Sequence, residues 1–289
     1  VGVWIRTDVF SSGSGDIYVT GISDARSSFN NEGIAASTGS SIRAEDTGNI
    51  NLHGIGGLGE DSNTNPGIHI SSTVSLKGSR VVAENGDINL IGVGRATGRE
   101  NYGVQLNARG QVIAGENVII TGIGGPESET SNNRVEGIFV DSSSKIESEG
   151  GGGNTISFIA DEITLQGENV VTGIGDVLQL QPNRADLDIF IGGAVESNIV
   201  TNIGRKVEDQ LHLSINDLDS LGNDFSKILI GNPTVPVIRV VRDESFQDSV
   251  FQDPVELRAN VIDTLGDSAD QKTNESILRD ATILGIDDA

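Results

Sequence analysis

A short, strand-like segment led by glycine recurs along this chain at a nearly constant interval, and it constrains the fold more than any other feature. Five copies begin at Gly2, Gly33, Gly67, Gly103 and Gly137, which lie 31, 34, 36 and 34 residues apart. In each copy the second and fourth residues are apolar, and period-two alternation places them on one face. The third residue varies freely and is expected to face outward. Such an interval predicts stacked structural repeats.

Two further strand-like segments follow in each unit. The second begins with Ile or Val and ends with Ala or Ser, as at residues 42–44 and 81–83. The third begins with Asp or Asn, continues with alternating aliphatic residues and is followed by glycine, as at residues 49–52 and 87–90. Three short strands per unit, joined by Gly- and Ser-rich corners, predict one coil of a right-handed parallel β-helix. The fold class is therefore an all-β solenoid with polar loop inserts.

Stacked coils align equivalent residues into ladders. One aliphatic ladder is expected to contain Ile17, Ile50, Ile88 and Val118. A polar ladder of Asp16, Asn49, Asp87 and Asn117 alternates charge with amide, which lessens like-charge repulsion and allows hydrogen bonds along the stack. The fifth unit stays open in register. Residues 163–165 fit its third strand, but residues 167–175 also echo residues 115–124.

Polar inserts of varying length separate the third strand of one unit from the first strand of the next. Because they occupy the same place in every unit, they are expected to project from one edge of the solenoid. They form either a binding face or tolerated surface loops, and the sequence leaves both interpretations open. The four inserts cover residues 23–32, 57–66, 94–102 and 125–136.

The regular spacing weakens near residue 180, so we divide the chain into three parts. Residues 1–178 are regular β-helix repeats, and residues 179–260 are interpreted as degenerate coils with a helical insertion; a separate small domain is the alternative. The insertion at residues 214–225 reads as a short helix with Asp217 as a cap. Residues 261–289 are expected to form a polar tail or a contact to a neighbouring segment.

Composition narrows the classes of partner. The formal net charge is −23, from 42 acidic and 19 basic residues. A surface this acidic argues against binding nucleic acid, which requires Lys and Arg to contact phosphates. No run approaches the ~20 apolar residues of a membrane span. Cys and Met are both absent, also at position 1, and we therefore expect a processed product or an excerpt of a longer protein.

Several stretches resemble a known family. They are the repeat pattern GIxI…GDINLxGxG, the segment LHLSINDLDSLGNDFSKILIG and the segment FQDPVELRA. Together they resemble the large repetitive exoproteins of the filamentous-haemagglutinin type, many of which occur in cyanobacteria. The resemblance covers most of residues 2–259 and implies a β-helical shaft, export by a two-partner route, and adhesion or extracellular filaments. The family's N-terminal secretion domain has no counterpart here.

Few residues qualify as functional candidates. Asp46, Glu84 and Asp87 offer stacked carboxylate oxygens for calcium, although no EF-hand loop is present. Trp4 and Phe139 occupy the outward place of the first strand, where they either form a contact surface or lie beneath adjacent loops. The histidines are interpreted as surface residues. No catalytic residue and no other cofactor is predicted.

The function predicted from these features is structural. We expect a secreted or cell-surface β-helical shaft that associates end to end with itself or with neighbouring segments, since neither end of the stack shows a strong cap. One alternative is an adhesin whose loop edge binds cell-surface glycans. Another is a β-helical polysaccharide lyase or hydrolase. We do not expect an enzyme, because an active site should break the repeat that the acidic residues follow.

Overall fold

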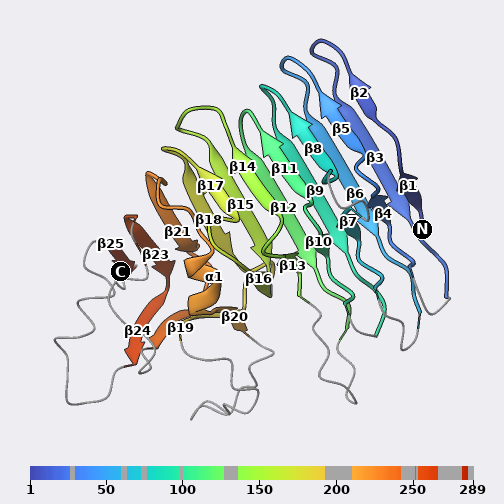
Figure 1. The fold of residues 1–289 in the computed structure, drawn as a ribbon. Helices are drawn as coiled ribbons and strands as arrows, with labels where there is room; N and C mark the ends of the chain where they lie inside the picture. Colours follow the sequence, from blue (N-terminus) through green and yellow to red (C-terminus); the bar gives the residue numbers. More distant parts are fainter. Residues whose placement is uncertain are drawn as a thin grey trace.

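The computed structural model describes residues 1–26, 30–59, 64–72, 77–97, 100–126, 136–192, 210–241, 251, 253–265 and 282–285. This part of the chain is nearly all β-structure, with parallel strands stacked in successive coils and one short helix, α1 (Ile215–Asp219). Figure 1 shows the stack running from the N-terminal coil to the C-terminal strands. The predicted all-β fold, a parallel β-helix with a short helical insertion, is confirmed.

Each regular coil contributes one strand to each of three parallel sheets. The first sheet contains β1 (Val3–Ile5), β4 (Ile34–Ala36), β7 (Ile68–Ile70), β10 (Val104–Leu106), β13 (Ile138–Val140) and β16 (Ile163–Leu165). The second contains β2 (Val9–Ser11), β5 (Ser41–Ala44), β8 (Arg80–Ala83), β11 (Gln111–Ala114), β14 (Lys145–Ser148) and β17 (Val171–Gly173). The third contains β3 (Ile17–Ile22), β6 (Ile50–Ile55), β9 (Ile88–Val93), β12 (Val118–Ile123), β15 (Thr155–Ala160), β18 (Val177–Gln181), β21 (Lys227–Gly231), β23 (Val255–Ala259) and β25 (Thr282–Gly285).

The coils stack in register, so that equivalent residues are neighbours across each sheet. Ile17 lies beside Ile50, Ile50 beside Ile88, and Ile88 beside Val118. The last three of these side chains are fully buried. The predicted aliphatic ladder therefore forms the centre of the core.

Glycine rows form the corner between the third sheet and the first. A Cβ built on Gly92 would lie 2.0 Å from the carbonyl oxygen of Gly103, which begins the next coil's first strand. The same close approach recurs between Gly54 and Gly67. No real Cβ can occupy that space, because backbone packs directly against backbone. A Cβ on the leading Gly103 would likewise lie 2.3 Å from the backbone nitrogen of Ile123, so the glycine that leads each of the five regular repeats is required by the tightness of this corner.

The structure settles the register of the fifth unit differently from either sequence alternative. Its third strand is β15, which pairs with β12. Ile163–Leu165 forms β16 and pairs with β13, so it opens the sixth coil as a first-sheet strand. The segment at residues 167–175 contains β17 of the second sheet. Only Asp161 and Glu162 separate β15 from β16. Because this connection contains neither a polar insert nor a leading glycine, the start of a new coil could not be recognised in the sequence.

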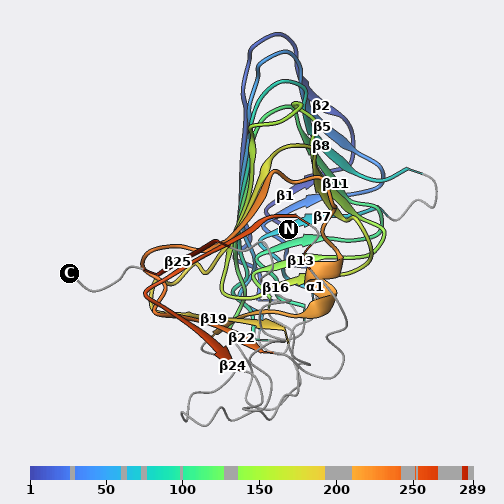
Figure 2. The same ribbon diagram turned by 90° about the vertical axis from the view of Figure 1, so that its left-hand side faces the viewer.

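Beyond β18 the chain alternates between the third sheet and a fourth, smaller one. This sheet contains β19 (Asp188–Gly192), β20 (Gln210–Leu213), β22 (Val237–Val241) and β24 (Val261–Leu265), all in parallel pairs. Figure 2 shows it on the same side of the stack as α1. One hydrophobic cluster runs from Ile5 to Ala259 without a break between regular and irregular coils.

Within the predicted tail, residues 266–281 and 286–289 lie outside the described part of the chain. The described remainder contributes β24 and β25 to the sheets. Most of the fourth polar insert, residues 127–135, also lies outside the described residues, as do residues 27–29, 60–63 and 98–99 of the other three.

The assignment of faces is testable with two neighbouring residues of β9. Ile88→Asp should lower the free energy of unfolding by roughly 3 kcal/mol or more, because it buries an unpaired charge in the core. Asn89→Asp on the outer face should change it by less than about 0.5 kcal/mol. Urea unfolding followed by circular dichroism measures both. Equal effects of the two substitutions would show that the faces are assigned wrongly.

Candidate functional site

The first coil forms an end of the stack at which all three sheets stop. β1, β2 and β3 each lie last in their sheet and pair with one strand only, namely β4, β5 and β6. Parallel strands present alternate backbone N–H and C=O groups to each side. Among the described residues, nothing pairs with the outer edges of these three strands. The first coil therefore offers three open strand edges side by side.

The hydrophobic core reaches this open end without a cover. Val9 is 36% exposed, whereas Ile42, its neighbour in the next coil, is completely buried. Val3 and Val19 are likewise only partly buried, although they pack against the core. These three side chains continue the inward ladders of the coils below. Their exposure follows from the lack of a coil above them.

The outward positions of the same coil carry an aromatic residue in every sheet. Trp4 in β1 is 58% exposed, Phe10 in β2 is 69% exposed and Tyr18 in β3 is 73% exposed. The Trp4 indole N–H donates to Ser37 Oγ at 2.7 Å, and the Arg6 guanidinium lies 4.8 Å from the centroid of the indole ring. Of the two alternatives that the sequence left open for Trp4, the structure favours an exposed position over one beneath adjacent loops.

At the other end of the regular coils the first and second sheets are closed, whereas the third sheet continues through β21, β23 and β25. Asp217 Oδ1 accepts the backbone N–H of Leu165 in β16 at 2.8 Å. Ser220 O accepts the N–H of Val170 at 2.9 Å, and Leu221 forms a bridge with Val171 of β17. Helix α1 and the residues after it thus satisfy the free edges of the first and second sheets. The third sheet continues past this point through β21, β23 and β25, so the expectation that neither end of the stack is capped stays a prediction.

The local sequence explains how the cap forms. Ser214 is the N-cap of α1 and forms a capping box with Asp217, whose Oδ2 accepts the Ser214 N–H at 2.8 Å. The helix ends at Asp219, earlier than the predicted residue 225, and Asp217 is the third residue of the capping box rather than the N-cap. Leu218, Leu221 and Phe225 are buried against the last coils.

The Asp217 carboxyl is buried, and this burial changes its pKa. Desolvation raises its pKa above the usual value, and hydrogen bonds from Ser214 and Leu165 offset part of that rise. The cap therefore contains a carboxyl that is held by hydrogen bonds at a place unfavourable to charge.

The polar ladder links the coils along the third sheet, as predicted. Asn49 N and Nδ2 donate to Asp16 Oδ1 at 2.8 and 3.1 Å, and Asp87 N donates to Asn49 Oδ1 at 2.8 Å. The pattern continues from Asn117 N to Asp87 Oδ1 at 2.9 Å and from Thr155 N to Asn117 Oδ1 at 2.8 Å. Each side chain accepts the backbone N–H of the next coil, and an amide separates the two carboxylates.

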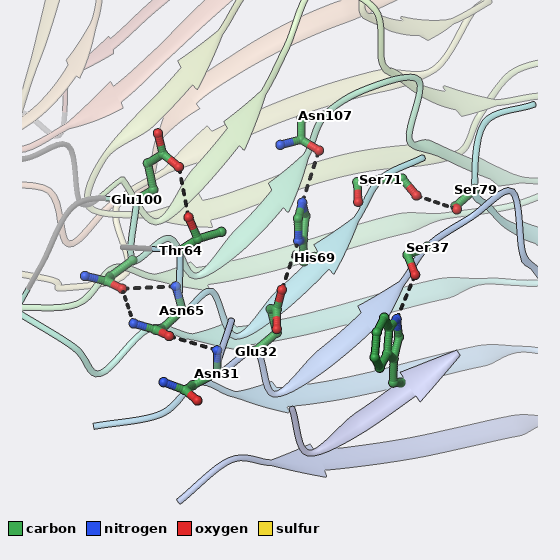
Figure 3. Close-up of polar contacts among 12 residues, drawn as sticks. Asn31, Glu32, Ser37, Thr64, Asn65, His69, Ser71, Ser79, Glu100 and Asn107 are labelled. Carbon is green, nitrogen blue, oxygen red and sulfur yellow. Dashed lines mark hydrogen bonds and ion pairs between the residues drawn. The ribbon is translucent and has the colours of Figure 1, made fainter. Parts of the chain in front are cut away.

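A second polar cluster on the outer face of the first sheet spans three coils (Figure 3). His69 Nε2 lies 3.1 Å from Asn107 Oδ1, and His69 Nδ1 lies 3.5 Å from Glu32 Oε1. The side chains of His69 and Glu32 are only 14% and 8% exposed. The interpretation of His69 as a plain surface residue is wrong, because the histidine ring joins the coils before and after it.

Phe139 lies in the same outward row, and its ring stacks on Tyr102 with centroids 4.9 Å apart. It is partly buried and offers less contact surface than Trp4.

Sequence reasoning missed an asparagine ladder at the base of the inserts. Asn31 N donates to Asn65 Oδ1 at 2.9 Å, and Asn65 N donates to Asn101 Oδ1 at 3.1 Å (Figure 3). All three residues are buried. The signal was available, because each asparagine stands two residues before the glycine that leads a first-sheet strand.

The three carboxylates predicted for calcium have separate surroundings. Asp46 is exposed in the turn after β5. Glu84 forms an ion pair with Arg43 of the neighbouring coil, and Asp87 Oδ1 accepts hydrogen bonds from Asn117. No group of three or more acidic or histidine side chains is arranged to hold a metal within the described ranges. Calcium binding stays a prediction.

No protein-family model, curated protein or solved structure matches this chain. Across the described residues, no helix has the length and apolar character needed to cross a membrane.

The cap is testable through Asp217. Asp217→Ala should lower the free energy of unfolding by about 1–3 kcal/mol, because the buried Leu165 N–H loses its acceptor. Asp217→Asn keeps an acceptor and removes the charge, and it should cost less. Because the folded state raises the pKa of this group, the stability that its protonated form contributes is complete below the usual value of 3.8 and is lost as pH rises through the raised pKa.

Urea unfolding of the wild-type protein and both variants between pH 3.5 and 7 measures these effects. The difference between the wild-type protein and Asp217→Asn should change with pH in the Asn variant's favour as pH rises. Equal losses in the two variants at every pH would contradict a capping role for this side chain.

Proposed function

We propose that this chain is a structural segment of an exported cell-surface or extracellular-filament protein, and that it forms part of a β-helical shaft. In this proposal the first coil stacks on another parallel β-helical coil. The observation that carries it is the uncovered core at Val3, Val9 and Val19, set against the closed edges at the other end of the regular coils. The exported location is supported by the resemblance to repetitive exoproteins.

A parallel coil is the partner whose shape fits this end. The open edges belong to three different sheets and need hydrogen-bonding partners in all three at once. A single added strand satisfies one edge only, whereas a coil supplies three. It also places inward side chains over the half-exposed valines, and full burial of an aliphatic side chain contributes roughly 1.5–3 kcal/mol. An open edge of this kind readily templates further pairing.

In isolation, another copy of the chain is the available cover for this end. Two copies that meet through their first coils would pair these strand edges antiparallel, as a weaker substitute for a parallel coil, and we expect the wild-type protein to associate into such pairs as its concentration rises. Val19→Lys places an ammonium group at the rim of the exposed core and should keep the protein monomeric. Sedimentation velocity at several concentrations measures the association.

Ile119→Lys is the matched control. Ile119 is 39% exposed on the outer face of the third sheet, in the middle of the stack, and its replacement should leave association unchanged. Circular dichroism verifies that both variants fold. A wild-type protein that stays monomeric, or equal suppression by both lysines, would contradict the role of the first coil. Long uniform fibres in negative-stain electron micrographs would contradict association through the first coils alone.

One observation favours glycan binding as a second function. Trp4 presents an exposed indole on the outer face of the first sheet, and aromatic rings provide apolar surfaces with polar edges. The Arg6 guanidinium and Ser37 hold the ring in place.

If this surface binds sugars, Trp4→Ala should abolish signals on a glycan array, whereas Ile123→Ala, at a position 40% exposed on the third sheet, should retain them. Signals that are insensitive to Trp4 would place the binding elsewhere, and a blank array for the wild-type protein would argue against this second function.

A further inference from the structure

In the first coil, one backbone N–H of the polar ladder has no hydrogen-bond acceptor among the described residues. Asp16 accepts from Asn49 on one side, but its own backbone N–H has no acceptor among the described residues. In the second to fifth coils the equivalent N–H is accepted by the side chain of the preceding coil, as Asn49 Oδ1 accepts from Asp87 at 2.8 Å. A coil stacked on the first one would bring a side chain to this position.

The ladder also restricts which residue type a stacked coil can place next to Asp16. Asp87 shows the arrangement around an internal carboxylate, since it lies between Asn49 and Asn117. Each of these amides donates from Nδ2 to the carboxylate of the preceding coil, over 3.1 Å for Asn49 and 2.9 Å for Asn117. The Oδ1 atom of each asparagine accepts a backbone N–H from the following coil. An amide therefore joins two coils without placing two negative charges next to each other.

Asp16 remains negatively charged at neutral pH. The Asn49 backbone N–H and the Tyr18 hydroxyl, which donates at 3.0 Å, hold the pKa of its carboxyl below the usual range. Neighbouring strands in a sheet lie about 4.8 Å apart. A second carboxylate in the preceding coil would repel Asp16 across that spacing, whereas an asparagine would not.

Resting on the proposed function above, we infer that the partner of the first coil is a parallel β-helical coil whose third strand is preceded by asparagine, in register with Asp16. The asparagine Oδ1 accepts the Asp16 N–H and continues the alternation of amide and carboxylate. This coil has the pattern of the chain's own second unit, in which Asn49 precedes β6. The open end thereby selects its partner through charge as well as through apolar contact.

The probe is an extra coil made from the chain's own sequence. Residues 33–66 are placed directly before Gly2, in the order in which they naturally precede Gly67, so that the copied Asn49 faces Asp16. A second extension carries Asn49→Asp in the copied coil only. A third carries Asn51→Asp in the copy, which adds the same charge at an outward position two residues further on. Hydrogen exchange of the Asp16 and Ile17 amides measures how well each coil covers the first one.

The asparagine coil should slow exchange at these amides relative to the chain without an extension. The Asn49→Asp coil should protect them about tenfold less, with protection recovering as pH falls towards 4, because repulsion between carboxylates is lost on protonation. The Asn51→Asp coil should protect them as well as the asparagine coil does.

Equal protection by all three coils would overturn the selection by charge and leave coil stacking intact. Exchange that no extension slows would overturn the stacking itself, and the inference with it.

Discussion

The structure depends on parallel pairing of whole coils in register. A single coil buries little apolar surface and satisfies few of its own backbone groups, so each coil is stable only between its neighbours. Register is enforced by the pleat, because a shift of one residue would turn every inward Ile or Val outward. The corner between the third and first sheets adds a second constraint, since Gly92 and Gly103 approach too closely for any side chain. At an end of the stack, a coil has a neighbour on one side only, so these two constraints act from that side alone.

The strand edges and the hydrophobic core are left without a neighbouring coil at an end of the stack, and the two sides of the regular coils differ in how these groups are satisfied. At the C-terminal end, the residues around α1 supply acceptors and donors to the edges of β16 and β17, and they bury Leu218, Leu221 and Phe225 over the core. At the first coil, Val9 and the outward aromatics are exposed, and Val3 and Val19 are only partly buried. The first and second sheets are therefore closed on one side of the regular coils and open on the other. This asymmetry is the physical basis for interpreting the open end as a joint.

Much of the stack could be predicted from local sequence. Period-two alternation placed Ile50, Ile88 and Val118 in one ladder, and the equivalent positions of Asp16, Asn49 and Asp87 gave the polar one. These predictions worked because each depends on a residue and its counterpart one repeat away. The sixth coil was misjudged for the same reason, since β16 follows β15 without an insert or a leading glycine.

Features that depend on distant segments escaped prediction. The role of Asp217 as an acceptor for Leu165 joins residues 52 positions apart and has no counterpart in the repeat. Outward positions were likewise expected to be exposed, yet Ala35 and Gln105 in the outer row of the first sheet are 5% and 3% exposed. Alternation shows which side of a strand a residue occupies, but not what covers that side. At Glu32, His69 and Asn107 the outer face is held together as closely as many interiors, so the rigidity of these coils comes from both faces of the sheet.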